Sequence, residues 1–172
     1  EMATAAKNDL LISNHSYGLG NDATQPAWTF GAYNDTALAW DELLKTTPNY
    51  LPFVACGNEQ QSNGSGKTGP LQGFDVVTGS SAAKNVVTVG AVNADRSMSD
   101  YSNFGPTDDG RVKPDICARG TGINSSAVAS DTAYAVEQGT SMAAPAASAA
   151  ALLLQQYYFS LNNSYMSASM LK

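Results

Sequence analysis

One serine stands where a glycine turn meets a long apolar segment, in the stretch from Gly139 to Pro145. The first turn of a helix exposes N–H groups without partners and carries a partial positive charge. A serine at that point can attack a carbonyl carbon while its own N–H faces the oxyanion that forms. The position fits two interpretations, a nucleophilic Ser141 and a helix N-cap without chemistry.

The elements that must position Ser141 alternate between strands and helices. Apolar residues at spacings of three and four indicate a helix over 30–45, and consecutive apolar residues over 86–92 indicate a strand covered on both faces. The expected order is the end of a helix at 2–9, a strand at 10–13, a helix at 30–45, strands at 51–56 and 86–92, a loop-rich region with short strands at 93–136, and a buried helix at 142–157. This order predicts an α/β fold with a parallel sheet, in which so few strands would leave a bare edge.

The composition narrows the class of protein. The chain has 172 residues, 43% of them hydrophobic and 14% charged, which favours one globular domain over a disordered segment. The net charge of −6 and the lack of a Lys/Arg cluster argue against a nucleic-acid partner, and no apolar run is long enough to span a membrane. No secretory leader is expected over 1–4. Cys56 and Cys117 are expected to be free, partly buried thiols, because they and a single histidine cannot complete a metal cage.

Four ordered segments decide between the two interpretations of the serine. The stretch from Gly139 to Pro145 resembles the nucleophile motif of the subtilases, the family of subtilisin. Segment 54–59 resembles the A-A-G-N segment of that family, segment 12–18 resembles its cleft strand ending in S-x-G, and segments 84–91, 101–105 and 113–116 follow its core pattern. The resemblance extends from about Leu10 to Leu154. It implies one partial peptidase domain over 1–172, with a three-layer, parallel-sheet subtilisin-like fold that is incomplete because the N-terminal half is absent.

The resemblance also implies a role for particular residues. Ser141 would be the nucleophile, and the side-chain amide of Asn58 would join the Ser141 N–H at the oxyanion. The residues implied in substrate binding are Ser16, Tyr17 and Gly18 at a strand edge that pairs with an extended peptide, Ala55, Cys56 and Gly57 around the pocket before the scissile bond, and Gly139 and Thr140.

Two catalytic residues of the family are missing from their expected places. The family's Asp and His segments precede the cleft strand, and this chain has almost nothing there. The only histidine, His15, lies within the cleft strand and outside the family's G-x-H motif, so a strand side chain is its expected role. Asp115 follows Pro114 and is expected to cap a loop. Ala146, which replaces a frequent histidine after the motif proline, concerns packing.

The expected activity is therefore that of a fragment. The parent would hydrolyse peptide bonds through a serine acyl-enzyme, while this chain without a base would be inactive; the alternatives are a pseudoprotease and a peptide-binding module. The expected partners are a peptide or protein substrate and either the missing half of the domain or a second copy of the chain. The resemblance implies a secreted protein, extracellular or in the cell envelope, and permits calcium in the parent but none in this chain. Asp108 and Asp109 are expected in a solvated turn, and the outer pocket wall is expected from loops 62–73 and 95–110.

Overall fold

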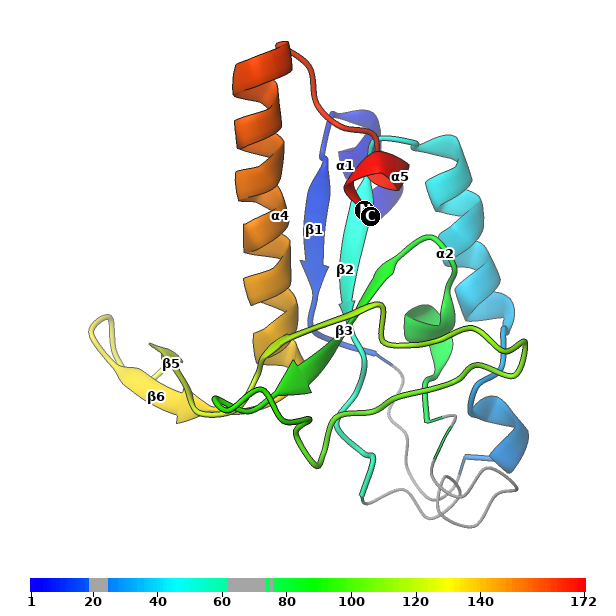
Figure 1. Cartoon of the computed structure of the whole chain (residues 1–172), viewed down its shortest axis with the longest axis vertical. Coiled ribbons are helices and arrows are strands. Elements are labelled where there is room, and N and C mark those ends of the chain that lie inside the picture. Colours follow the sequence, from blue (N-terminus) through cyan, green and yellow to red (C-terminus); the bar gives the residue numbers. More distant parts are fainter. Residues whose placement is uncertain (19–24, 62–73, 75) are drawn as a thin grey trace.

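Four parallel strands form the sheet at the centre of the molecule, and a helix covers each face (Figure 1). The computed structural model describes residues 1–18, 25–61, 74 and 76–172. The elements are α1 (Met2–Lys7), β1 (Ile12–His15), the 3₁₀ turn η1 (Ala27–Thr29), α2 (Asp35–Thr46), β2 (Leu51–Ala55), the 3₁₀ turn η2 (Gly79–Ala82), β3 (Val87–Val92), β4 (Ile116–Arg119), β5 (Ile123–Ser126), β6 (Tyr134–Glu137), α4 (Thr140–Asn162) and α5 (Ala168–Leu171). The strand order β1-β2-β3-β4 confirms the expected α/β fold with a parallel sheet.

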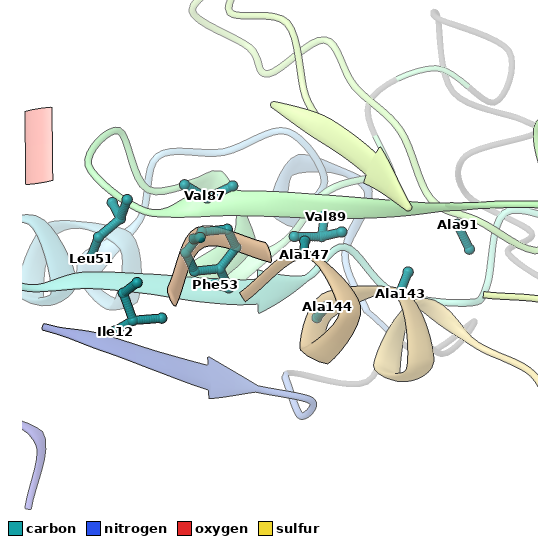
Figure 2. Packing of buried hydrophobic residues seen from close by; sticks show 10 residues of the cluster. Ile12, Leu51, Phe53, Val87, Val89, Ala91, Ala143, Ala144 and Ala147 are labelled. Carbon is teal, nitrogen blue, oxygen red and sulfur yellow. The ribbon is translucent and has the colours of Figure 1, made fainter. Parts of the chain in front are cut away.

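Alternating side chains of the central strands point into two separate cores. Phe53 of β2 packs toward α4 together with Val89 of β3, whereas the next residue of β2, Val54, packs in the second core with Ala37 and Leu44 of α2 (Figure 2). Both faces of β2 and β3 are therefore covered, which is why these strands are apolar at consecutive positions. The sheet and the two helix layers make the three layers that the sequence predicts.

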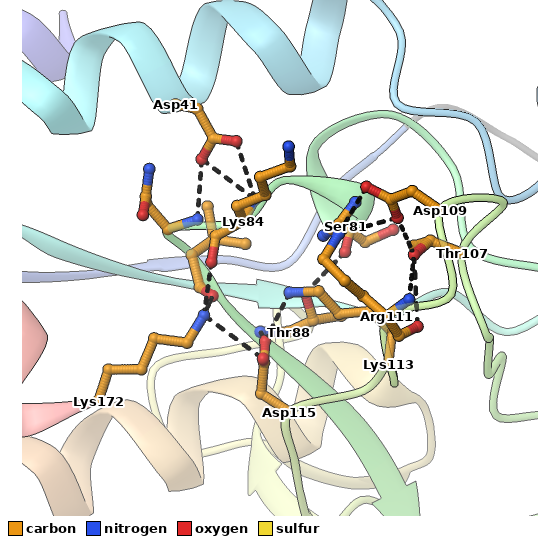
Figure 3. A network of polar contacts seen from close by, with 12 residues as sticks. Asp41, Ser81, Lys84, Thr88, Thr107, Asp109, Arg111, Lys113, Asp115 and Lys172 are labelled. Carbon is orange, nitrogen blue, oxygen red and sulfur yellow. Dashed lines mark hydrogen bonds and ion pairs between the residues drawn. The ribbon is translucent and has the colours of Figure 1, made fainter.

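Helix α2 begins five residues later than expected, at Asp35 instead of Phe30. The Asn34 side chain accepts hydrogen bonds from the Thr36 and Ala37 N–H groups, so it caps the helix and fixes its first turn. The separate turn η1 ends at Thr29, so Phe30 and Tyr33 lie in the connection between η1 and α2. The inner face of α2 carries the Asp41 carboxylate as well as apolar side chains. This carboxylate accepts hydrogen bonds from the Lys84 and Asn85 N–H groups in the connection before β3 (Figure 3).

Helix α4 is buried on one side only. Its inner positions are small residues, among them Ala143, Ala144 and Ala147, which let the helix lie close to β2 and β3 (Figure 2). The prediction of a helix buried all round is wrong, because Leu153 and Tyr157 are each 66% exposed. No segment in the described part of the chain covers this outer side. Among the described helices, none is both long and apolar enough to cross a membrane.

Strand β1 begins two residues later than expected and includes His15. The loop-rich region contributes β4 to the sheet, while β5 and β6 form a two-stranded antiparallel hairpin that projects from the body of the molecule (Figure 1). Asp115, expected to cap a loop, accepts a hydrogen bond from the Thr88 N–H at 2.7 Å and pairs with the buried Lys113 ammonium at 2.7 Å (Figure 3). Asp109, expected in a solvated turn, pairs with Arg111 at 2.9 Å.

Candidate active site

Ser141 lies in the first turn of α4, directly after a tight approach of two backbone segments. Gly139 is the N-cap residue, has a φ of 152°, and donates its N–H to the Gly120 carbonyl at 2.9 Å. A Cβ on Gly120 would lie 2.6 Å from the Gly139 carbonyl oxygen, so a side chain there would push the serine turn away. Gly120 was not among the site residues predicted from the sequence. Only its contact with Gly139 in the fold shows that a side chain has no room there.

The backbone carbonyl of Ser141 is bonded outside the helix. Pro145, expected in or beside the first turn, lies in the second turn, where it lacks the N–H that would bond to this carbonyl. The Ser16 hydroxyl, just after β1, donates to the same carbonyl at 2.8 Å. In return the Ser141 hydroxyl donates to the Ser16 carbonyl at 3.4 Å. The candidate nucleophile is thus tied to the end of the cleft strand.

The orientation of the Asn58 amide follows from its partners. Its Oδ1 accepts from the Thr140 N–H at 2.8 Å and from the Thr140 hydroxyl at 3.0 Å, and that hydroxyl accepts from the Gly57 N–H at 3.1 Å. Because a backbone N–H can donate only to the oxygen, the Nδ2 group must point elsewhere. Within the described residues, neither Asn58 Nδ2 nor the Ser141 N–H has a partner.

Thr140, predicted in substrate binding, also contacts the two segments that carry Asn58 and Ser141. Its side chain is fully buried, and its hydroxyl already donates one hydrogen bond and accepts another. A hydroxyl has one hydrogen to donate, so this one orients Asn58 and the serine turn.

A cavity of about 180 Å³ adjoins Ser141 and gathers nearly all of the candidate residues. It is lined by Ser16, Tyr17, Gly18, Ala55, Cys56, Gly57, Asn58, Glu59, Thr78, Ser80, Ser81, Thr140 and Ser141. Of the residues predicted from the sequence, Gly139 alone is not in this lining, because it acts from behind as the N-cap. The hydroxyl-bearing residues of η2 and Thr78 make part of this pocket polar. The expected wall at 62–73 lies outside the described residues.

Cys56 is not a competing nucleophile. It is buried, and burial raises the pKa of its thiol, so the sulfur stays protonated at neutral pH. Cys117, in contrast to the expectation of partial burial, is exposed on β4, where it has no disulfide partner among the described residues.

Asn103 is a supporting residue that the sequence analysis did not identify. It is fully buried, and its Oδ1 accepts from the Glu59 N–H at 2.9 Å while its Nδ2 donates to Glu59 Oε2 at 3.0 Å. Glu59 Oε2 also accepts from the Asn58 N–H at 2.8 Å. Gly57, with a φ of 110°, leaves room for the Asn103 amide that any Cβ would strike. These contacts hold the segment that carries Asn58.

His15 faces away from the serine. Its ring lies edge-on to Trp40 of α2, and its two nitrogens lie near the hydroxyls of Tyr17, Ser13 and Tyr50. Because α2 and α4 cover opposite faces of the sheet, this imidazole does not reach Ser141. Burial lowers the pKa of His15. The expectation that His15 is a strand side chain agrees with this position.

A larger cavity, of about 770 Å³, lies between α2 and α5 and contains neither Ser141 nor Asn58. Its lining includes Asp41 and Lys84, which bond to neighbouring backbone and to an aromatic ring. Size therefore does not identify the site; the arrangement of nucleophile and hydrogen-bond donors does.

The Peptidase_S8 description of the subtilase family matches the chain over residues 1–172. The chain therefore belongs to the subtilase family.

Solved structures show the same fold. This chain is similar to the prenylagaramide maturation protease PagA, with a TM-score of 0.66 and 20% identity over 97% of this chain and 52% of that one. It is similar to the patellamide maturation protease PatA, with a TM-score of 0.67 and 22% identity over 97% of this chain and 53% of that one. It is also similar to a cold-adapted subtilisin-like serine proteinase, with a TM-score of 0.59 and 24% identity over 93% of this chain and 45% of that one. The chain spans about half the length of these structures.

Proposed function

We propose that this chain carries the serine nucleophile and the oxyanion-binding groups of a subtilisin-like serine endopeptidase. The observation that carries the proposal is a pair of donors without a partner among the described residues, Asn58 Nδ2 and the Ser141 N–H, beside a cavity lined by both residues. Thr140 holds the Asn58 oxygen, so the amide need not reorganise as charge develops on a substrate. Preorganised donors of this kind stabilise the tetrahedral intermediate of acyl transfer.

Each candidate residue has one step in this mechanism. A peptide would pair as an extended strand with the edge formed by Ser16, Tyr17 and Gly18, with the side chain before the scissile bond in the cavity beside Ala55, Cys56 and Gly57. Ser141 Oγ would form a bond to the carbonyl carbon, and its proton would pass to a base and then to the leaving amine. Water would release the acyl group by the same route in reverse.

The base and its carboxylate partner come from outside these residues in this proposal. The single histidine is engaged on the opposite face of the sheet, and within the described residues the Ser141 hydroxyl bonds only to a backbone carbonyl. The exposed outer side of α4 and the outer edge of β1 offer a surface for the segments that carry the catalytic Asp and His. The partner would be the other half of the domain, with a second copy of this chain as the alternative.

A non-catalytic peptide-binding module is the second candidate. It is favoured by the Ser141 hydroxyl itself, because no imidazole activates it among the described residues and its ordinary pKa is high. The cavity and the strand edge would then bind peptides without cutting them.

Labelling by a fluorophosphonate separates the two candidates. The chain alone is expected to remain unlabelled, and the complex with the complementary half of the domain is expected to take up one label, which Ser141→Ala abolishes. In that complex Asn58→Leu should lower kcat by about a hundred- to a thousandfold, the range known for loss of the corresponding donor in subtilisin itself. Labelling of the chain alone, or a Ser141→Ala complex that still cleaves peptides, contradicts the proposal.

Location and calcium are proposed on family resemblance. We propose an extracellular or cell-envelope location for the parent, and calcium only as a ligand of the parent. Within the residues that the structure describes, no three His, Cys, Asp or Glu side chains gather into a cation site.

A further inference from the structure

A buried histidine is linked to the exposed aromatic ring at the mouth of the cleft. His15 is only 6% exposed, and its Nδ1 lies 2.7 Å from the Tyr17 hydroxyl. Its Nε2 lies 2.6 Å from the Ser13 hydroxyl, which in turn lies 2.6 Å from the Tyr50 hydroxyl. The proposed mechanism uses none of these contacts.

The contacts of His15 together fix the orientation of its ring. A neutral imidazole has one donor and one acceptor nitrogen, so either tautomer can bond to Tyr17 on one side and to Ser13 on the other. The ring edge also packs against Trp40 of α2, with centroids 4.9 Å apart. The imidazole is therefore held by β1, by α2 and by Tyr50 before β2, and its position leaves little freedom to the phenol bonded to it.

Within the described residues, the Tyr17 hydroxyl has no hydrogen-bond partner other than His15. It is 64% exposed and lines the cavity that contains Ser141. An exposed side chain of this size ordinarily samples several rotamers, and ordering it upon peptide binding costs conformational entropy. A bond to a buried, immobile ring removes that cost beforehand.

We propose that His15 is a positioning residue that holds the Tyr17 ring as a fixed wall of the peptide-binding cleft, and that this wall favours apolar over acidic peptide side chains. The inference rests on the proposed function of the cleft. An aromatic face packs well against an apolar side chain, whereas an acidic one would also meet the Glu59 carboxylate at the same cavity.

The surroundings of His15 keep it neutral. The titratable groups that face it are the Tyr17 and Tyr50 hydroxyls, and α2 contributes the indole of Trp40; no carboxylate contacts the ring among the described residues. Burial without a counter-ion lowers the pKa of His15, which maintains the donor-acceptor pairing at neutral pH.

The test uses the fact that the chain has a single histidine, so one set of imidazole NMR signals reports on this ring alone. The probes are acetyl-Ala-Leu-Ala-Leu-amide and the matched acetyl-Ala-Asp-Ala-Asp-amide, added to the full 172-residue chain. The leucine peptide is expected to bind more tightly and to shift the imidazole signals as it does so. Tyr17→Phe, which keeps the ring and removes only the hydroxyl, should shift the imidazole signals of the free protein and weaken the leucine peptide about fivefold, as loss of one neutral hydrogen bond does.

The matched variants distinguish positioning from a general loss of packing. His15→Gln can still donate to the Tyr17 hydroxyl and is expected to bind the leucine peptide nearly as tightly as the unsubstituted chain does. His15→Leu should bind it about fivefold more weakly. Adding Tyr17→Phe to His15→Leu should cost nothing more, because both remove the same bond. If His15→Leu does not fold, the exposed Tyr17→Phe variant and the imidazole signals carry the test.

Several results would overturn the inference. These are imidazole signals that ignore Tyr17→Phe, additive losses in the double variant, and equal affinity for the two peptides. Failure of the unsubstituted chain to bind the leucine peptide also overturns the inference. None of these affects the proposed protease function, which the labelling of Ser141 tests separately.

Discussion

The helices on the two faces of the sheet differ in how completely they are packed. The inner side of α2 is buried and bonded to the backbone before β3, while its outer positions carry charged residues such as Glu42 and Lys45. The outer side of α4 instead presents large apolar residues, including Leu153, Tyr157 and Leu161, to solvent. A polar outer face is typical of a finished surface, whereas an apolar one of this extent marks an interaction site.

The difference shows which side of the molecule presents an apolar surface. Within the described residues, no segment packs against the outer side of α4. Ser141 lies in the first turn of α4. A partner bound to the outer side of α4, as proposed above, would therefore lie on the same face of the sheet as the serine.

The largest expected effect is a loss of stability on the side of the sheet covered by α2. The Asp41 carboxylate accepts hydrogen bonds from the backbone N–H groups of Lys84 and Asn85 (Figure 3). It also accepts one from the Tyr33 hydroxyl at 2.7 Å. Burial and this bond raise the pKa of Tyr33 to about 12, so the phenol remains a donor. Asp41→Ala strands three donors and should lower the free energy of unfolding by about 3 kcal/mol, measured by urea denaturation. The exposed neighbour Glu42→Gln is the control, and an equal loss there would remove the contrast between the two sides of α2.

The inner side of α4 should be the next most sensitive. Ala144 is fully buried against the sheet, so Ala144→Leu overpacks the core and should cost about 2 kcal/mol in the same measurement. Ala149 lies on the exposed side of the same helix, and Ala149→Leu should be nearly neutral. Similar losses at both positions would show that the outer side is covered in solution.

The response to acid should come from the side of α2. Burial lowers the pKa of His15 below 6.5, so the unfolded state takes up this proton first as the pH falls. The stability contributed by the neutral imidazole should therefore be present above pH 6.5 and decline as the pH falls from there toward the folded-state pKa. Thermal unfolding at a series of pH values measures this decline. His15→Gln should flatten this part of the profile, and an unchanged profile in that variant would assign the response to other groups.

The smallest change in stability is expected on the outer side of α4. Leu153→Lys combined with Leu161→Lys should alter the free energy of unfolding by no more than about 0.5 kcal/mol, because both side chains already face water. The same pair should strongly weaken association with the complementary half of the domain, or self-association, measured by sedimentation. Intact association in this variant would place the partner elsewhere.

Much of the fold could be predicted because it depends on local patterns. Strands β2 and β3 are runs of consecutive apolar residues, and both were located to within a residue at each end. The serine turn was recognisable because a glycine, the serine, small residues and a proline follow in the fixed order of the subtilase motif. The start of α2 was missed because Phe30 fits the apolar spacing, while the side chain of Asn34 ends it.

The remaining features depend on contacts between distant segments. The burial of α4 was overestimated because its composition shows what the helix could cover and not what is present to cover it. The orientation of Asn58 depends on Thr140, and its support depends on Asn103, which are distant in sequence. The His15 contacts likewise combine β1 with Trp40 of α2 and with Tyr50 before β2.

The proline in the second turn of α4 has a mechanical consequence. Because Pro145 has no N–H to bond to the Ser141 carbonyl, that carbonyl accepts a hydrogen bond from the Ser16 hydroxyl instead. This hydrogen bond connects the serine turn directly to the end of the cleft strand. Because Ser16 and Ser141 are bonded to each other, a peptide that displaces the strand edge is expected to displace the serine turn with it. Seating of a ligand and alignment of the attacking oxygen are then one coupled movement, so a poorly seated peptide meets a misaligned oxygen.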